Sequence, residues 1–420
     1  MPSVRYIMAE LTEARKAAGM ESIRELYKTG RGPSSSHTMG PERACIAFRA
    51  RVPEADFFLV RLYGSLAKTG VGHGTDVVIE KTLAPIPCRV ELDTATVIDG
   101  HPNTMDIIAY REGVELERAR VESVGGGSIV FEGGAVEPPP RIYKLASFTA
   151  IAEYCKRRHI RIWEYALEIE GEGFYDYMRG IWDAMKESIH RGLDDEGILP
   201  GGLDVHKKAR SLFNSGHIDE TAETRENRMV CAYAFAVSEQ NASGERIVTA
   251  PTCGASGVLP AVMYYRQKKA RLSDDRIIEA LITAGVVGNL IKTNASISGA
   301  ECGCQAEIGS ACAMAAAALA ELCELHIDKI EYAAEIAIEH HLGLTCDPIC
   351  GLVQIPCIER NAVAAMRAIN AVNLANFLWD TRKISFDHVV ETMRQTGMDL
   401  RSGYKETSEA GLAKIDLKQD

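Results

Sequence analysis

Three cysteines stand close together in the stretch LTCDPICGLVQIPC, residues 344–357. Thiolates bind zinc and iron–sulfur clusters, but zinc sites usually take their cysteines in pairs two to four residues apart. No two cysteines of this chain are spaced C-x-x-C, and Val353 stands where a C-x-x-x-C-x-x-C motif would have its third cysteine. Cys346, Cys350 and Cys357 are therefore either ordinary buried thiols or part of a site whose other ligands come from elsewhere in the chain.

Nine of the 12 cysteines lie between Cys231 and Cys357. In a long chain this concentration favours reduced thiols with a metal or redox role over a disulfide framework. Cys302 and Cys304 follow the segment SISG, where a helix is expected to begin, and the helix dipole stabilises a thiolate at that end. Cys304 is thus a better candidate ligand than an average core cysteine. Cys253, in the loop APTCGASG, is either a ligand or an ordinary loop thiol lining a pocket.

Two histidines stand in polar, glycine-rich segments. The segment GRGPSSSHTMGP places His37 among hydroxyl groups that could bind an anion; the alternative is a solvated loop with a helix N-cap. The segment YGSLAKTGVGHGTD places His73 near Asp76, and an imidazole with a carboxylate partner suits proton transfer near neutral pH. The alternative there is a surface histidine in a turn. The glycines fit neither G-x-G-x-x-G nor a Walker phosphate loop.

The elements that would carry these side chains divide the chain into two regions. The N-terminal third is predicted to be an α+β domain, with a helix over Glu21–Tyr27 and strands over 57–63, 89–98, 116–124 and 129–131. Three consecutive prolines, residues 138–140, resist both helix and central strand. We therefore place a linker at about 133–145, between domains at 1–140 and 146–420.

The remainder is predicted to be a larger all-α domain of about nine helices joined by glycine-rich turns. Helical periodicity covers residues 148–157, 162–190, 223–239, 257–270, 274–291, 305–325, 330–341, 358–378 and 386–396. The most apolar window, Ala311–Leu322, is alanine-rich and too short to span a membrane, so a buried helix is expected there.

Composition restricts the class of protein. The chain of 420 residues is 46% hydrophobic and 25% charged, a globular mixture with ample apolar surface for a core. The net charge of −11 argues against nucleic acid as a partner, and no run of 18 apolar residues could span a membrane. The N-terminus mixes acids and bases without an apolar signal core, so a cytoplasmic protein is expected.

These segments together resemble one family, the iron–sulfur-dependent L-serine dehydratases (L-serine ammonia-lyases). PSSSHTMGP and YGSLAKTGVGHGTD resemble signatures of the β domain of that family. NASISGAECGCQAEIGSAC, HHLGLTCDPICGLVQIPCIERNA and ETSEAGLA resemble those of its α domain, so the likeness runs in family order from about Ile23 to Ala413. It implies a single chain with fused β and α domains that deaminates L-serine to pyruvate and ammonia.

The resemblance also implies a [4Fe–4S] cluster held by three thiolates, one each from G-A-E-x-G-C-Q, L-T-C-D-P and Q-[IV]-P-C-I-E-R-N. The matching positions here are Cys304, Cys346 and Cys357, which leaves Cys302 and Cys350 as bystanders. Clusters usually take four thiolates, so one iron would stay open and act as a Lewis acid on the carboxylate and hydroxyl of serine. Pyridoxal phosphate would not be needed.

By the same resemblance His37 and His73 face the cluster across the domain interface, one as base or proton relay and the other in substrate binding. The sequence does not distinguish these two roles. The hydroxyl residues expected to hold the substrate's carboxylate and ammonium are Ser34, Ser35, Ser36, Thr38, Ser296 and Ser298. The expected partners are a small amino-acid substrate and, from the family, a second copy of the chain in a homodimer.

Several alternatives stay open. The same scaffold could act on another β-substituted amino acid such as threonine or cysteine, because selectivity rests on the shape of the pocket. A pyridoxal-phosphate lyase with Lys292 as Schiff base lacks a convincing glycine-rich phosphate loop beside that lysine. In a non-catalytic iron–sulfur or regulatory protein, His37 and His73 would be merely structural.

The end of the sequence departs from the family pattern. Many members end in a cysteine whose thiolate can occupy the open iron, whereas this sequence ends GLAKIDLKQD and has no cysteine after Cys357. We therefore expect the fourth iron to be free for water or substrate, or to be bound by an oxygen ligand.

Overall fold

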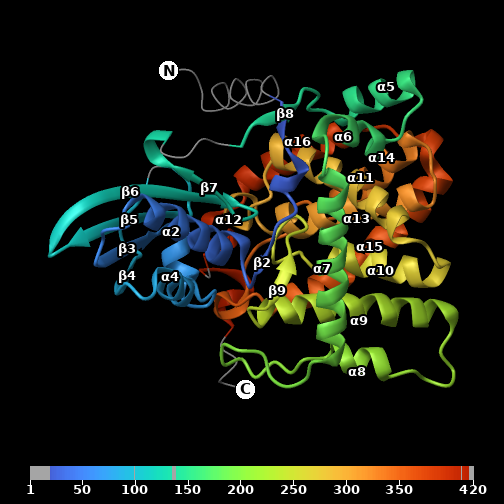
Figure 1. The fold of residues 1–420 in the computed structure, drawn as a ribbon. Helices are drawn as coiled ribbons and strands as arrows, with labels where there is room; N and C mark the ends of the chain where they lie inside the picture. The colour runs from blue at the N-terminus through green and yellow to red at the C-terminus, as the bar shows by residue number, and fades with distance from the viewer. Residues whose placement is uncertain (1–18, 99, 135–138, 408, 416–420) are drawn as a thin grey trace.

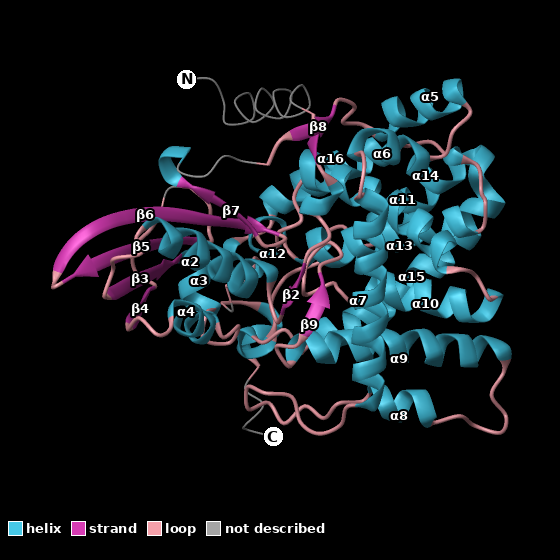
Figure 2. Cartoon of the chain, in the orientation of Figure 1, coloured by secondary structure: helices cyan, strands magenta, loops and turns pink. Residues whose placement is uncertain are grey.

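The computed structural model describes residues 19–98, 100–134, 139–407 and 409–415. An N-terminal region built around a β-sheet lies beside a larger C-terminal region built mainly of helices (Figures 1 and 2). The predicted succession of an α+β part and a helical part is confirmed at this level. The boundary at the prolines stays a prediction: Pro138 lies outside the described residues, and Pro139 and Pro140 lie in irregular chain before β8 (Arg141–Tyr143).

The sheet of the N-terminal region has five strands in the order β4-β3-β5-β6-β7. Their bounds are β3 Phe57–Tyr63, β4 Cys88–Asp93, β5 Thr104–Arg111, β6 Val114–Gly125 and β7 Ser128–Phe131. β3 and β4 are parallel and are joined through α3 (Gly64–Thr69) and α4 (Thr75–Leu83); the other neighbours are antiparallel. Side chains alternate along β3, and Phe58, Val60 and Leu62 form one core with residues of α2 (Gly40–Arg51) and α4.

Strand β5 is missing from the predicted strands, and its sequence shows why. The segment TMDIIAYR has Asp106 in its middle, and aspartate is depleted in strands. In the fold this carboxylate is buried but paired, accepting hydrogen bonds from Arg120 Nε at 2.7 Å and from the Tyr63 hydroxyl at 2.9 Å. Side chains on the two neighbouring strands thus form hydrogen bonds with an aspartate that is unfavourable in a strand on its local preference alone.

The segment before the sheet also departs from the prediction. Residues 21–27, predicted as a helix, form instead the end of β1 (Met20–Glu21) and a short 3-10 turn, η1 (Ile23–Glu25). The carboxylate of Glu170 holds this conformation by accepting hydrogen bonds from Ile23 N and Ser22 Oγ, each at 2.6 Å. β1 pairs with β8, and β2 (Thr29–Arg31) pairs with β9 (Arg246–Val248), so the segment packs into the helical region.

The predicted helices of the C-terminal region are present, except that the segment 162–190 is divided. Gly171 and Gly173 both have a φ of 74°, in the left-handed region that ends a helix, so two helices form. The helices are α5 Phe148–Arg158, α6 Ile162–Glu170, α7 Phe174–Asp194, α8 Ala209–Asn214, α9 Ala222–Ala242, α10 Val258–Ala270, α11 Asp274–Asn294, α12 Gly299–Cys302, α13 Ser310–Leu322, α14 Ile327–Glu339, α15 Cys357–Leu378 and α16 Phe386–Asp399.

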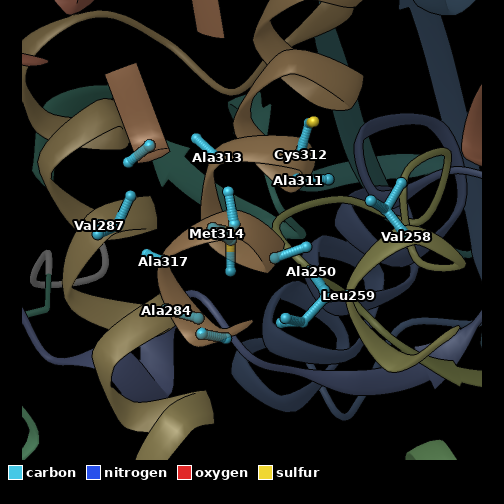
Figure 3. Packing of buried hydrophobic residues seen from close by; sticks show 14 of the residues in the cluster. Ala250, Val258, Leu259, Ala284, Val287, Ala311, Cys312, Ala313, Met314 and Ala317 are labelled. Carbon is cyan, nitrogen blue, oxygen red and sulfur yellow. The ribbon is translucent and has the colours of Figure 1, made fainter. Parts of the chain in front are cut away.

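Helix α13 is buried along its whole length and packs against α10, α11, α14 and α15. Figure 3 shows Met314 and Ala317 of this helix near Ala284 and Val287 of α11. Alanine is the strongest helix former, and its small side chain lets neighbouring helices approach closely. The predicted buried helix over residues 311–322 is therefore confirmed. Within the described part of the chain, no helix combines the length and apolarity needed to cross a bilayer.

Candidate active site

The three cysteines singled out as ligands line one cavity, although they come from three separate segments. Cys304 stands between α12 and a π-helical turn, η4 (Gln305–Gly309); Cys346 lies in extended chain bridged to Lys405; and Cys357 begins α15. Gly299, at the start of α12, allows this approach because a Cβ on it would lie only 3.1 Å from Cys346 Sγ. Tertiary packing thus assembles a three-thiol group that no local spacing could form.

The three thiols do not ionise alike. A hydrogen bond from Cys346, together with the nearby guanidinium of Arg360, lowers the pKa of Cys304 to about 6, and the same bond holds the pKa of Cys346 well above its ordinary value. Burial raises the pKa of Cys357. Arg360 is held in place by donating to the Thr345 carbonyl at 2.7 Å. The cavity therefore contains one readily formed thiolate near the half-buried cation of Arg360, which favours metal binding.

The predicted bystanders Cys302 and Cys350 lie elsewhere, as does Cys253, whose role as a ligand the sequence leaves open. Cys302 packs against Gly397 of α16, where a Cβ on the glycine would come within 2.5 Å of its sulfur. Cys253 is buried with its sulfur 3.3 Å from Met39 Sδ, and it does not line the cavity of the three thiols. Cys350 is exposed and lines a different, larger cavity.

His37 lies in a π-helical turn, η2 (Ser35–Met39), that continues directly into α2. The alternative of a solvated loop is wrong, because this histidine is fully buried, although its expected N-cap is present: Ser34 Oγ accepts from His37 N at 3.1 Å. Ser65 Oγ donates to the Glu406 carbonyl at 2.7 Å, so it must accept from His37 Nε2 at 3.1 Å. His37 Nδ1 then accepts from Ser36 Oγ at 2.9 Å. Both ring nitrogens therefore have partners, and burial lowers the pKa of His37 well below its ordinary value.

His73 follows α3 and is only 1% exposed. Its Nδ1 must donate to the Thr69 carbonyl at 2.9 Å, which leaves a lone pair on Nε2. That Nε2 is buried without a hydrogen-bond partner among the described residues, and burial lowers the pKa of His73 to about 4. The prediction that Asp76 orients this ring is wrong, because the carbonyl at the end of α3 takes that place.

Glu406, to which the sequence analysis assigns no role, lies between the two histidines. Its Oε1 is 3.6 Å from His37 Nδ1 and 3.6 Å from His73 Nε2, and the residue is 5% exposed. Its backbone N donates to the Cys346 carbonyl at 2.8 Å, and its φ of 58° is in the left-handed region that glutamate rarely adopts. Burial raises the pKa of Glu406 well above its ordinary value and lowers the pKa of both histidines, which favours the uncharged form of all three groups. The available signal was the segment ETSEAGLA, which begins at this residue.

Glu307 is a second carboxyl that sequence reasoning left without a role. It lines the same cavity, accepts a hydrogen bond from Thr252 Oγ1 at 2.9 Å, and has its Oε2 3.9 Å from Cys346 Sγ. Burial raises the pKa of Glu307 to about 8. Protonated carboxyl groups thus flank the thiols on two sides.

The six hydroxyl residues predicted to hold the substrate are all buried: Ser34, Ser35, Ser36, Thr38, Ser296 and Ser298. Ser34 lines the cavity of the cysteines. Ser36 is bonded to His37, and Thr38 Oγ1 donates to the His73 carbonyl at 3.2 Å. Ser296 is hydrogen-bonded to Glu301, whereas Ser298 Oγ has no partner among the residues described. Thr38 therefore links the segments that carry the two histidines.

Two donor sets could hold metal. His37, His73 and Glu406 have ligand atoms within 4.8 Å of one another, an arrangement that a single divalent cation could use. The three thiols suit an iron–sulfur cluster in their chemistry, with one favoured thiolate and Arg360 to offset its charge. The cavity they line has a free volume of about 20 Å³, the size of one water, so a bound cluster would have to move the thiols apart.

Two family models match this chain. One, described as the serine dehydratase beta chain, matches residues 22–87; the other, described as the serine dehydratase alpha chain, matches residues 106–413. The chain is 39% identical to an L-serine dehydratase of Haemophilus influenzae and 40% identical to the L-serine dehydratase TdcG of Escherichia coli, in each case over 94% of this chain and 99% of the relative. It is 37% identical to an L-serine dehydratase of Helicobacter pylori, over 94% of this chain and 98% of the relative.

Proposed function

Because the chain belongs to the serine dehydratase family, with the beta and alpha chains of that family joined in one polypeptide, we propose that it deaminates L-serine to pyruvate and ammonia. The observation that carries the proposal is the single cavity in which three cysteine thiols face His73 and Glu406. The reaction removes the α-proton and the β-hydroxyl of serine, and the aminoacrylate that forms tautomerises and hydrolyses. It therefore needs a base, an acid and a group that holds the substrate.

We infer that Cys304, Cys346 and Cys357 hold a [4Fe–4S] cluster through three thiolates. Such a cluster, when bound, supplies an iron that acts as a Lewis acid on the substrate hydroxyl and carboxylate. Arg360 supports this assignment, because its guanidinium lies against Cys304 and the thiols raise its pKa further. Lys292, the alternative Schiff-base lysine, donates to Glu21 at 2.7 Å and does not line this cavity.

We assign the base to His73. Its Nε2 has a lone pair, lies in the cavity and has no hydrogen-bond partner among the described residues, so it is free to accept the α-proton. The lowered pKa keeps the ring neutral, and therefore basic, at pH 7. His37 is assigned to positioning, because Ser36 and Ser65 occupy both of its nitrogens.

We assign the acid to Glu406. A carboxyl that stays protonated at neutral pH can give its proton to the leaving hydroxyl, which then departs as water. His73 would return the α-proton to Glu406 across the 3.6 Å between Nε2 and Oε1, which restores both groups. The proton taken from carbon is thus the one that replaces the proton given to oxygen.

The experiment is an assay on protein prepared without oxygen. A broad visible absorption that bleaches in air, together with serine-dependent pyruvate, is expected. The variant His73→Gln should lose about 10²- to 10⁴-fold in kcat with the absorption retained, and His159→Gln, an exposed histidine at the end of α5, is the matched control. A colourless, fully active protein would remove the cluster from the proposal, and full turnover by His73→Gln would remove the base.

The same preparation tests the remaining expectations. Comparing kcat/KM for serine, threonine and cysteine decides which β-substituted amino acid is preferred. We keep the cytoplasmic homodimer implied by the family as part of the proposal, and sedimentation of the purified chain tests the dimer.

A further inference from the structure

A second cavity, which we call the outer cavity, lies beside the site. It has a volume of about 1070 Å³, whereas the cavity of the three thiols, the inner cavity, has about 20 Å³. Its walls come from Thr38 and from the segments 31–33, 68–81, 200–201, 242–245 and 350–354, so both regions of the chain contribute. This volume is at the upper end of the range for small-molecule sites and far exceeds what one amino acid needs.

The two cavities meet at three residues. Pro33, His73 and Val353 line both cavities. Within the described part of the chain, every other lining residue lines only one of the two. One of the three is the histidine assigned as base, whose free Nε2 is buried and without a partner. We call this junction the throat. A substrate that enters through it would reach the base before it reaches the cysteines.

The wall at the throat is the loop that joins two of the cysteine ligands. In this loop, residues 348–356, Pro348 and Val353 face the inner cavity, whereas Cys350 and Gln354 face the outer one. The loop is closed by Ile349 N donating to the Ile355 carbonyl at 3.0 Å, and Gln354 Nε2 donates to the Pro200 carbonyl. These hydrogen bonds hold the loop in one conformation between the two cavities.

Close backbone contact holds this loop against the N-terminal region. A Cβ on Gly72, the residue before His73, would lie 2.7 Å from the Cys350 carbonyl oxygen, so only a glycine permits this approach. The loop and His73 are therefore held at a fixed distance from each other. A larger or smaller side chain at Val353 would narrow or widen the throat. The cationic side chains of Arg31, Lys68 and Lys81 line the outer cavity with Glu245, and Lys68 is paired with Glu409. The remaining positive charge suits a ligand with a carboxylate group.

We propose that the outer cavity is the route by which a small amino-acid zwitterion reaches the inner cavity, that Val353 sets the width of the throat, and that Cys350 is a thiol at which modification obstructs the route. The identity of the substrate in this proposal rests on the proposed function, whereas the existence of the route does not. Val353 is half-buried and Cys350 is exposed, so both can be changed without opening the core.

Substitutions at the throat test the route in the holoenzyme. Val353→Trp should lower kcat/KM for serine by about tenfold or more, with the visible absorption unchanged. Val353→Ala should raise kcat/KM for threonine relative to serine. Val77→Trp is the matched control: this side chain is 46% exposed and lines the outer cavity away from the throat, so kcat/KM should stay within about twofold. Equal effects at the two valines would overturn the assignment of the throat.

The native thiol gives a second, chemical test. Anaerobic alkylation with bulky N-pyrenylmaleimide should lower kcat/KM more than alkylation with small iodoacetamide, and Cys350→Ser should be protected from both losses. If Cys350→Ser is inhibited as strongly as the parent chain, the obstruction at this thiol is refuted.

A third measurement needs no turnover. In the full chain freed of metal, the rate at which iodoacetamide alkylates Cys304 is followed by peptide mass spectrometry. Val353→Trp should slow this rate by about tenfold and Val353→Ala should speed it, whereas Val77→Trp should leave it unchanged. Absence of serine turnover in the parent chain, with these rates as expected, refutes the proposed function and supports the route; unchanged rates refute the route whatever the turnover.

Discussion

Replacing Glu406 by Gln is the most direct test of the acid–base arrangement. The substitution keeps the shape of the side chain and its backbone bond to Cys346 but removes the proton that the leaving hydroxyl needs. After Glu406 gives up this proton, its carboxylate stands 3.6 Å from a protonated His73. Two unit charges at this distance attract by about 4.6 kcal/mol at an effective dielectric constant of ~20.

That attraction is an upper limit on what the carboxylate contributes, and it corresponds to about 10³-fold in rate. General acid catalysis typically contributes about 10²- to 10⁴-fold, in the same range. We therefore expect Glu406→Gln to lower kcat for L-serine by about 10²- to 10³-fold. The visible absorption should not change, because Glu406 is not among the inferred sulfur ligands.

The discriminating assay compares L-serine with β-chloro-L-alanine. Chloride leaves without a proton, so Glu406→Gln should be much less impaired with this substrate than with serine. Glu409 lies three residues after Glu406, and its exposed carboxylate pairs with Lys68. Glu409→Gln therefore serves as the control for the loss of one charge in this segment. Equal losses with both substrates would refute the role as acid and leave Glu406 as a residue that only positions its neighbours.

The other predictions concern the thiols and the histidine. Cys357→Ser should lose most of the visible absorption and iron, whereas Cys253→Ala, a buried thiol outside the cavity, should keep both, as measured by absorption and iron analysis. Arg360→Gln should move the pH midpoint for alkylation of Cys304 in the metal-free chain upward from about 6, because a neighbouring cation favours the thiolate; an unmoved midpoint would contradict this. The depressed pKa of His73, about 4 against an ordinary 6.5, means that the unfolded chain binds the proton more readily, so the free energy of unfolding should fall by about 3 kcal/mol as the pH falls from 6.5 to 4. Urea denaturation of His73→Gln should lack this part of the pH dependence, and an identical dependence in both proteins would refute the buried neutral ring.

Several features of this fold follow from short-range patterns. Helical periodicity predicts most of the helices after residue 148, although it joins α6 and α7 and omits the short α8 and α12, and alanine content predicts that α13 is buried. Local reasoning is wrong where a distant side chain decides the structure. Glu170 stabilises a short strand and a 3-10 turn in place of the helix predicted at 21–27, and Arg120 and Tyr63 stabilise Asp106 inside β5.

The candidate site shows the same division. The motifs select Cys304, Cys346 and Cys357, and the structure places them in one cavity. Glu406 stands in the segment ETSEAGLA without a neighbouring histidine or cysteine, so nothing next to it in the sequence indicates a chemical role. Only its left-handed backbone and its bridge to Cys346 bring its carboxyl between the histidines.

The sequence by itself determines most of the helices, which thiols could be ligands and which family the motifs resemble, because these depend on residue type and on neighbours within a few positions. The tertiary structure decides which thiol ionises, which histidine nitrogen is free and which carboxyl stays protonated. The pKa of Cys304 depends on Cys346 and Arg360, and the tautomer of His73 depends on one carbonyl of α3. Ionisation and tautomer respond to burial and to partners a few ångströms away, and those partners become neighbours only when distant segments of the chain pack together.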